Sequence, residues 1–289
     1  MTNPLRIPAD ADLEEFAHQA GAKLPQITLL FWVMKISATT LGETGGDMFA
    51  QTLKLGYFLT TIALFAVFVI SLIAQLRSRH YSPILYWSVI LTTSMAGTTI
   101  SDFMNRDASY LATGQESLGW GPQGLGLGYP AGAAILGSLL LIIFIAWRAT
   151  GHPFSLHNIR SLKAEALFWS AILVSNTLGT SLGDFLADSS SLGYAGGAAV
   201  IGGALVIVAI LKFVPRVSNV VLFWIAFVLT RPLGATVGDF ISKPAVKGGL
   251  GFGTYGASAV LLVVLVGGVV WMSVRERRTR ALSVAPVTA

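Results

Sequence analysis

The sequence predicts an all-α polytopic membrane protein with eight transmembrane helices. They form four parallel-oriented two-helix repeats with pseudo-symmetry about the membrane normal. Three observations lead to this prediction. Hydrophobic residues make up 54% of the 289 positions and charged residues only 11%. Eight apolar stretches are each long enough to supply the ~20 residues that cross a bilayer core, and one motif occurs four times along the chain.

Composition excludes several classes of protein. Soluble domains carry about 25% charged residues, so a soluble enzyme, a nucleic-acid-binding domain and a disordered chain are excluded. The chain has no cysteine, which excludes disulfides, thiolate catalysis and cysteine-ligated metals. No Ser/Lys or paired-Asp catalytic motif stands out, so we expect no enzyme activity and no cofactor other than a bound cation. The expected partners are the lipid bilayer and a cation, and a homo-oligomer is left open.

Loop charges predict how the spans are oriented. Thirteen Lys and Arg residues flank the spans on the side of the two tails, and four, Lys54, Arg106, Lys243 and Lys247, lie on the other side. The positive-inside rule therefore predicts a multi-pass inner-membrane protein with both termini in the cytoplasm. In chain order, the predicted spans cover residues 26–47, 55–76, 83–103, 128–148, 164–185, 194–214, 218–240 and 254–274.

The repeat is defined by four stretches that align without gaps: FWVMKISATTLGETGGD, YWSVILTTSMAGTTISD, FWSAILVSNTLGTSLGD and FWIAFVLTRPLGATVGD. Each has a Trp 15 positions, a Gly five positions and a hydroxyl residue three positions before an Asp. The hydroxyl residues are Thr44, Thr99, Ser181 and Thr236. Since each copy crosses the membrane twice, all four share one orientation.

These repeats divide the chain into seven segments. A cytoplasmic N-terminal segment is followed by two repeats, a cytoplasmic linker, two further repeats and a basic cytoplasmic tail. Their predicted ranges are 1–25, 26–80, 81–149, 150–163, 164–216, 217–274 and 275–289.

A polar column precedes each motif Asp. Residues four apart lie on one stripe of a helix, and polar side chains avoid lipid because burying them unpaired is costly. Four columns on like-oriented helices should therefore converge on a central path whose acidic end faces the outside. The columns are Thr39, Glu43 and Asp47; Ser94, Thr98 and Asp102; Asn176, Thr180 and Asp184; and Arg231, Ala235 and Asp239.

A second interpretation of the Asp residues stays open. Each lies about 22 Å along the helix from its Trp, near the end of the span, where it could cap the helix at the lipid headgroups. The polar residues four and eight positions deeper favour the path, because a cap does not need them. The Trp residues are expected in an aromatic belt at the cytoplasmic interface: Trp32, Trp87, Trp169 and Trp224.

Lys35 and Arg231 are the two basic residues inside predicted spans. Against Glu43 and the four Asp residues they leave an excess of about three negative charges. Ionisable groups within a membrane are usually functional or paired. The two cations therefore either neutralise nearby carboxylates, or act as a gate by leaving a pair when a cation or proton binds.

Small residues mark the even-numbered spans. Their spacing predicts that helix backbones touch there in lipid. They recur as Gly128, Gly132, Ala133 and Gly137, and as Gly193, Gly197, Ala198 and Gly202.

The motifs KISATTLGETGGD and LGTSLGDF resemble those of an uncharacterised family of bacterial multi-spanning membrane proteins, over the full chain. This resemblance implies no activity. Glu43, Gly46 and Asp47 are also similar to the Glu-x-Gly-Asp motif of cation/proton exchangers. The spacing here is one residue longer, and Met48 and Phe49 stand where that family has basic and hydroxyl residues. The similarity implies a divalent cation such as Mn²⁺.

Carboxylates and hydroxyls bind hard cations. The sequence therefore predicts a transporter or channel for such a cation, either a divalent metal or a monovalent cation or H⁺. The alternative is a non-transporting scaffold or sensor that acts through its tails and the outer loop 106–127. The expected metal ligands are Glu43, Asp47, Asp102, Asp184 and Asp239.

Overall fold

A computed structural model describes residue 25 and residues 27–78, 81–106, 124–150, 162–214 and 217–284. The N-terminal segment, most of the outer loop 106–127 and most of the linker 150–163 therefore lie outside the described residues. Within the described ranges all regular secondary structure is helical, as predicted. The long helices are α2 (Leu29–Asp47), α3 (Tyr57–Arg77), α4 (Pro83–Asn105), α5 (Tyr129–Ala149), α6 (Leu162–Asp184), α7 (Gly193–Leu211), α8 (Asn219–Ser242) and α9 (Gly253–Val284).

The four motif helices form an inner ring. Helix α2 packs against α4, α4 against α6, α6 against α8, and α8 against α2. Ion pairs join their last turns, so the motif Asp residues share one end of the ring, which we call the Asp end. Aromatic contacts join their first turns at the opposite Trp end.

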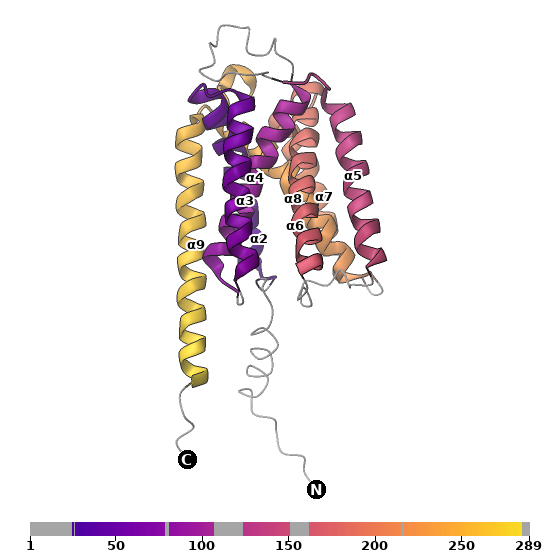
Figure 1. Ribbon diagram of the computed structural model, residues 1–289. Coiled ribbons are helices and arrows are strands. Elements are labelled where there is room, and N and C mark those ends of the chain that lie inside the picture. The colour runs from indigo at the N-terminus through magenta and orange to yellow at the C-terminus, as the bar shows by residue number, and fades with distance from the viewer. Residues whose placement is uncertain are drawn as a thin grey trace, which may run out of the picture.

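The other four helices surround this ring, and each packs on the inner helix of the next repeat. Helix α3 contacts α4, α5 contacts α6, and α7 contacts α8. Helix α9 contacts α2, so the last repeat closes on the first. In Figure 1 the helices run lengthwise along one direction, and α9 extends beyond the others at one end.

The motif glycines explain how the inner helices approach so closely. Each lies against the residue that stands eight positions before the Asp in the next helix around the ring. A methyl group at Gly97 would lie 2.9 Å from Asn176, and one at Gly234 would lie 2.6 Å from Thr39. Glycine is required at this position because any side chain there would overlap the neighbouring helix. The four pairs are Gly42 with Ser94, Gly97 with Asn176, Gly179 with Arg231, and Gly234 with Thr39.

The glycines of the outer helices have mixed roles, which corrects the prediction that all of them serve packing. Gly132 lies against Asn105, and a methyl group at Gly197 would lie 3.2 Å from Thr236, as close packing requires. A methyl group at Gly137 or Gly202 would have nothing within 4 Å, so these two make no such contact among the described residues. Gly128 and Gly193 belong to the same predicted set of small residues. They have positive φ angles of 75° and 63° and stand where helices begin, not where helices touch.

The exterior is apolar and the interior is polar. Large apolar side chains are exposed on every outer helix, among them Ile70, Leu141, Ile207 and Val263. In the described part of the chain, α3, α5, α7, α8 and α9 up to Arg277 are long and apolar enough to cross a membrane. Helices α2, α4 and α6 carry many of the buried hydroxyl and charged residues, which lowers their hydropathy. An apolar exterior around a polar centre is the arrangement expected of helices in lipid.

The tryptophans do not form an interfacial belt, and that prediction is wrong. Trp87 and Trp169 are each 1% exposed, and Trp224 is buried beside them. The ring of Trp224 lies 5.8 Å from that of Trp147 on α5 and 6.0 Å from that of Phe168. Of the four motif tryptophans, only Trp32 is partly exposed. The first turns of the inner helices pack together, so their indoles fill the centre of the bundle instead of pointing to the headgroups.

Candidate cation site

The four motif Asp residues converge at the Asp end of the inner ring. Asp47, Asp102, Asp184 and Asp239 are all 2% exposed or less. Each comes from the last turn of an inner helix, where the 3.6-residue period directs it to the same side as the column below it. The carboxylates therefore face the interior of the ring and not its outer surface.

Two basic side chains join these carboxylates in pairs. Arg106 donates from Nε to Asp102 Oδ1 at 2.8 Å and from Nη2 to Asp184 Oδ2 at 3.2 Å. Lys243 Nζ lies 2.5 Å from Asp47 Oδ2 and 3.4 Å from Asp239 Oδ1. Gln51 Nε2 donates to the second oxygen of Asp47 at 2.5 Å.

The sequence analysis assigned Arg106 and Lys243 to the outer loops, and each does follow the end of its helix, but its side chain turns inward. Arg106 is buried and Lys243 is largely buried. Burial disfavours the charged form of Lys243, but Asp239 and Asp47 raise the pKa of its ammonium well above the ordinary value. A signal was present in the sequence, because each residue stands four positions after a motif Asp. The polar column continues one step beyond the Asp in repeats 2 and 4.

Arg231 and Glu43 form the next layer of the ring. Arg231 Nη2 lies 3.2 Å from Glu43 Oε2 and donates to Thr180 Oγ1 at 2.7 Å. It also contacts Thr98 Oγ1, which itself donates to Glu43 Oε2 at 3.2 Å. The predicted column residues of all four helices therefore meet here, and a fully buried ion pair fills the axis.

Below this layer the axis becomes aromatic. Lys35 is fully buried, and its Nζ lies 4.0 Å from the ring centroid of Phe227. Nζ has no hydrogen-bond partner among the described residues. An ammonium over an aromatic face is stabilised by a cation–π interaction. Lys35 therefore neutralises no carboxylate by direct contact, unlike Arg231.

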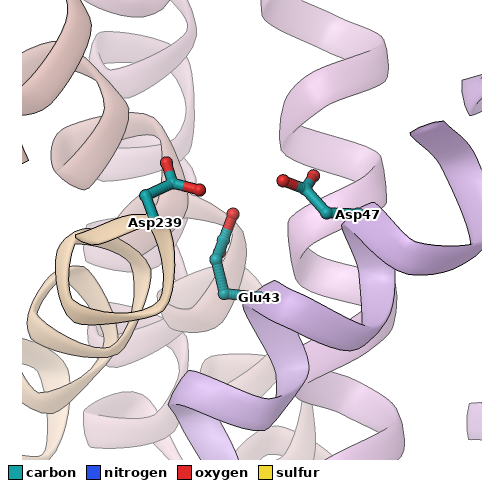
Figure 2. Close-up of side chains that lie close together, drawn as sticks. All are labelled: Glu43, Asp47 and Asp239. Carbon is teal, nitrogen blue, oxygen red and sulfur yellow. The ribbon is translucent and has the colours of Figure 1, made fainter. Parts of the chain in front are cut away.

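Three carboxylates could hold a metal ion together. Glu43, Asp47 and Asp239 each offer an oxygen, and these oxygens all lie within 4.8 Å of one another. Figure 2 shows the Glu43 carboxylate pointing between the two Asp carboxylates, with Glu43 and Asp47 on α2 and Asp239 on α8. We call these three residues the acidic triad. The other two predicted ligands are Asp102 on α4 and Asp184 on α6, and both form ion pairs with Arg106.

The hydroxyl residues three positions before each Asp lie away from the triad. Thr44 accepts a hydrogen bond from Ser258 of α9 at 2.9 Å, and the methyl of Thr236 lies against Gly197 of α7. Ser181 is hydrogen-bonded to Ser101 of α4 at 2.8 Å. Thr99 bonds to backbone carbonyls of its own helix. Thr44, Ser181 and Thr236 therefore contact neighbouring helices, whereas the residues in steps of four from the Asp line the axis.

Deeper in the ring, several polar atoms lack partners within the described ranges. They are Ser94 Oγ and both side-chain polar atoms of Asn176. Thr39, at the same level, bonds to the Thr230 carbonyl across the α2–α8 seam at 3.1 Å.

The charge balance differs from the sequence prediction. Four basic side chains, and not two, lie in or at the end of the inner ring: Lys35, Arg106, Arg231 and Lys243. Against five acidic side chains they leave an excess of one negative charge instead of three. The acids are therefore largely compensated in this state of the protein.

One family of proteins matches the chain. It is described as Repeat of Unknown Function (DUF347), and it matches four times, at residues 30–81, 85–152, 167–218 and 222–278. The chain belongs to this family. No curated protein and no solved structure matches the chain.

Each DUF347 repeat of this chain corresponds to one inner helix and the outer helix that follows it. The first match covers α2 and α3, and the last covers α8 and most of α9. The four inner helices of the DUF347 repeats carry the motif Asp residues, so each repeat contributes one carboxylate to the Asp end. The cation/proton exchanger similarity receives no support from these matches and stays a prediction.

Proposed function

We propose that this DUF347 protein is a membrane carrier for a hard cation, with the acidic triad as its substrate site. In this proposal all eight helices cross the inner membrane as four parallel repeats about an axis along the membrane normal, with both termini in the cytoplasm. The observation that carries the proposal is the convergence of four buried carboxylates, one from each repeat, on the axis of the ring. Helix caps at the headgroups would not need to meet.

The distribution of apolar surface supports a membrane location. The exposed faces of α3, α5, α7 and α9 carry Val, Ile, Leu and Phe side chains, which water would not tolerate over so large a contiguous area. Helices α2, α4 and α6 are too polar to face lipid alone, but the outer helices cover them. Their polar columns then face the axis, where partners are available.

The donor atoms support a hard cation. The triad offers carboxylate oxygens only, and oxygen ligands suit Mg²⁺, Ca²⁺ and Mn²⁺ as well as Na⁺ and K⁺. In this proposal the cation is transported and not permanently bound, so it must be able to enter the site from one side and leave it toward the other.

The closed axis supports a carrier over an open channel. The Arg231 guanidinium, which is paired with Glu43 of the triad, closes the axis beneath the triad, and Lys35, Phe227 and the buried tryptophans follow it toward the Trp end. A cation at the triad could therefore reach the other side only after the inner helices rearrange, as alternating access requires.

Flux measurements in liposomes test the proposal. The purified protein is reconstituted, and uptake of Mn²⁺, Na⁺ and K⁺ is followed with reporters trapped inside. We expect one of these cations to enter with the wild-type protein, and Glu43→Gln or Asp239→Asn to reduce its entry to the level of protein-free liposomes. Each variant is first shown to be monodisperse and to stay folded at the temperature of the flux measurement.

Asp188→Asn is the matched control. Asp188 is an exposed carboxylate in η4 (Phe185–Ser189), four positions after Asp184, and it lies outside the triad. It should retain wild-type flux. Equal flux in folded Glu43→Gln and wild-type protein, or no flux of any of the three cations, would contradict the proposal and favour a scaffold or sensor.

A further inference from the structure

The positively charged ammonium of Lys243 lies on the acidic triad. Its ammonium lies 2.5 Å from Asp47 Oδ2 and 3.4 Å from Asp239 Oδ1, and therefore contacts carboxylates of two of the three triad residues. It lies 3.4 Å from Gln51 Oε1 as well. A metal ion held by the triad would need oxygens of the same Asp47 and Asp239 carboxylates, so the ammonium and a substrate cation compete for these two residues.

The position of Lys243 allows its side chain to leave. It is the first residue after α8, and its side chain is 12% exposed, against 2% and 3% for its two Asp partners. The backbone is held by hydrogen bonds from Gly251 N to Lys243 O and from Leu250 N to Phe240 O, at 2.9 and 2.7 Å. For the Lys243 ammonium to leave the triad, its long side chain must therefore rotate toward the outer surface, and the helix does not need to move.

We propose that the Lys243 ammonium is a tethered counter-ion that occupies the triad when substrate is absent, and that the substrate is a divalent cation that binds by displacing it. This inference rests on the proposed function. It assigns Lys243 as a specificity-determining residue at the entrance and narrows the substrate from hard cations in general to divalent ones.

Charge identifies the divalent class. With Lys243 displaced, the three triad carboxylates and the Arg231 guanidinium on Glu43 leave two negative charges at the site. A divalent cation neutralises both, whereas a monovalent cation would leave one uncompensated in a buried position, which is unfavourable. With Lys243 in place, only one negative charge remains at the triad.

Replacement of Lys243 by a modifiable residue tests the inference. Because the chain has no native cysteine, Lys243→Cys carries a single thiol. Mn²⁺ affinity is measured by electron paramagnetic resonance on the purified full chain. We expect Lys243→Cys to bind Mn²⁺ at least about tenfold more tightly than wild type, because apparent affinity falls with the fraction of molecules whose site is not free.

Chemical modification of this cysteine then adds either a positively charged or an uncharged group to the same folded protein. An aminoethyl thiosulfonate converts the cysteine into a lysine analogue and should return the Mn²⁺ affinity to the wild-type value. A methyl thiosulfonate adds no charge and should leave the affinity high, and reduction should reverse both. Lys247→Cys is the matched control, since Lys247 lies in the same loop but is exposed, and the same treatments should not change its affinity.

The outcomes separate the inference from the proposed function. If wild type and Lys243→Cys bind Mn²⁺ equally well, the tethered counter-ion is wrong while the cation site stands. If neither folded protein binds Mn²⁺, Na⁺ or K⁺, the proposed function itself fails. If both bind Na⁺ but not Mn²⁺, the divalent assignment is wrong.

A measurement on the wild-type chain covers the case in which Lys243→Cys does not fold. The rate at which a water-soluble amine reagent modifies Lys243 is followed by mass spectrometry as Mn²⁺ is added, with exposed Lys54 and Lys247 as internal references. Displacement predicts faster modification of Lys243 at saturating Mn²⁺ and unchanged rates at the references. An unchanged or slower rate at Lys243 overturns the inference.

Discussion

At the scale of single residues, the Arg231 guanidinium contacts all three other inner helices. Nη1 donates to the Thr39 carbonyl on α2 at 3.0 Å, Nη2 to the Ser94 carbonyl on α4 at 3.2 Å, and Nη2 to Thr180 on α6 at 2.7 Å. Its ion pair with Glu43 is fully enclosed by these groups. Removing one member of a buried pair leaves the other charge uncompensated, which is more costly than removing both.

Arg231→Met should therefore lower the free energy of unfolding by about 3–5 kcal/mol. The double variant Glu43→Gln/Arg231→Met should lose less than the sum of the two single variants, because it leaves no isolated charge. Chemical unfolding in detergent micelles, followed by tryptophan fluorescence, measures all three. Additive losses would show that the two side chains do not act as a pair.

The residues of the ring differ in how far the sequence could predict them. Glu43, Thr98 and Thr180 follow from the repeat and the helical period, and they do meet at one level. Arg106 and Lys243 follow the ends of their helices, where the backbone leaves the helix in an extended conformation. Their inward direction depends on the neighbouring helices, so a count of loop charges, which assigned them to the outer side, does not show that they turn toward the ring.

At the scale of elements, glycines of the same type have different consequences. A methyl group at Gly97 would lie 2.9 Å from Asn176 on the neighbouring helix, whereas one at Gly137 would have nothing within 4 Å. The sequence indicates that both are small residues in apolar helices. It does not indicate which outer helix covers which inner helix, and that pairing decides whether a glycine is at a contact.

Gly97→Ala should lower the free energy of unfolding by about 1–3 kcal/mol, because α4 and α6 must separate to admit the methyl group. Gly137→Ala is the matched control in an outer helix, and it should raise stability by up to about 1 kcal/mol through helix propensity. Thermal unfolding in the same detergent compares them. Equal effects of the two substitutions would mean that the inner helices are less closely packed than described.

At the scale of the whole molecule, the two ends of the described chain close the bundle. Each outer helix covers the inner helix of the next repeat, and α9 covers α2. Thr44 and Ser258 are hydrogen-bonded at 2.9 Å across this junction, although they lie 214 positions apart in the sequence. The four repeats and their length were predictable from the motif spacing. The cyclic order was not, because hydropathy carries no information about the partner of each helix.

A cysteine pair tests this closure. In Thr44→Cys/Ser258→Cys the two thiols should form a disulfide on mild oxidation, since the hydroxyl oxygens that they replace lie in contact. Counting free thiols with a maleimide reagent gives an unambiguous result, as the chain has no other cysteine. The disulfide should stabilise the fold by about 2–4 kcal/mol because it closes a long loop.

Thr44→Cys/Gly267→Cys is the control for that closure. Gly267 lies on α9 nine residues beyond Ser258, about 13 Å along the helix axis, and a methyl group there would contact nothing within 4 Å. Both thiols of this pair should stay free under the same oxidation. A disulfide in the control, or two free thiols in Thr44→Cys/Ser258→Cys, would mean that α9 does not hold the position against α2 on which the cyclic arrangement of the four repeats depends.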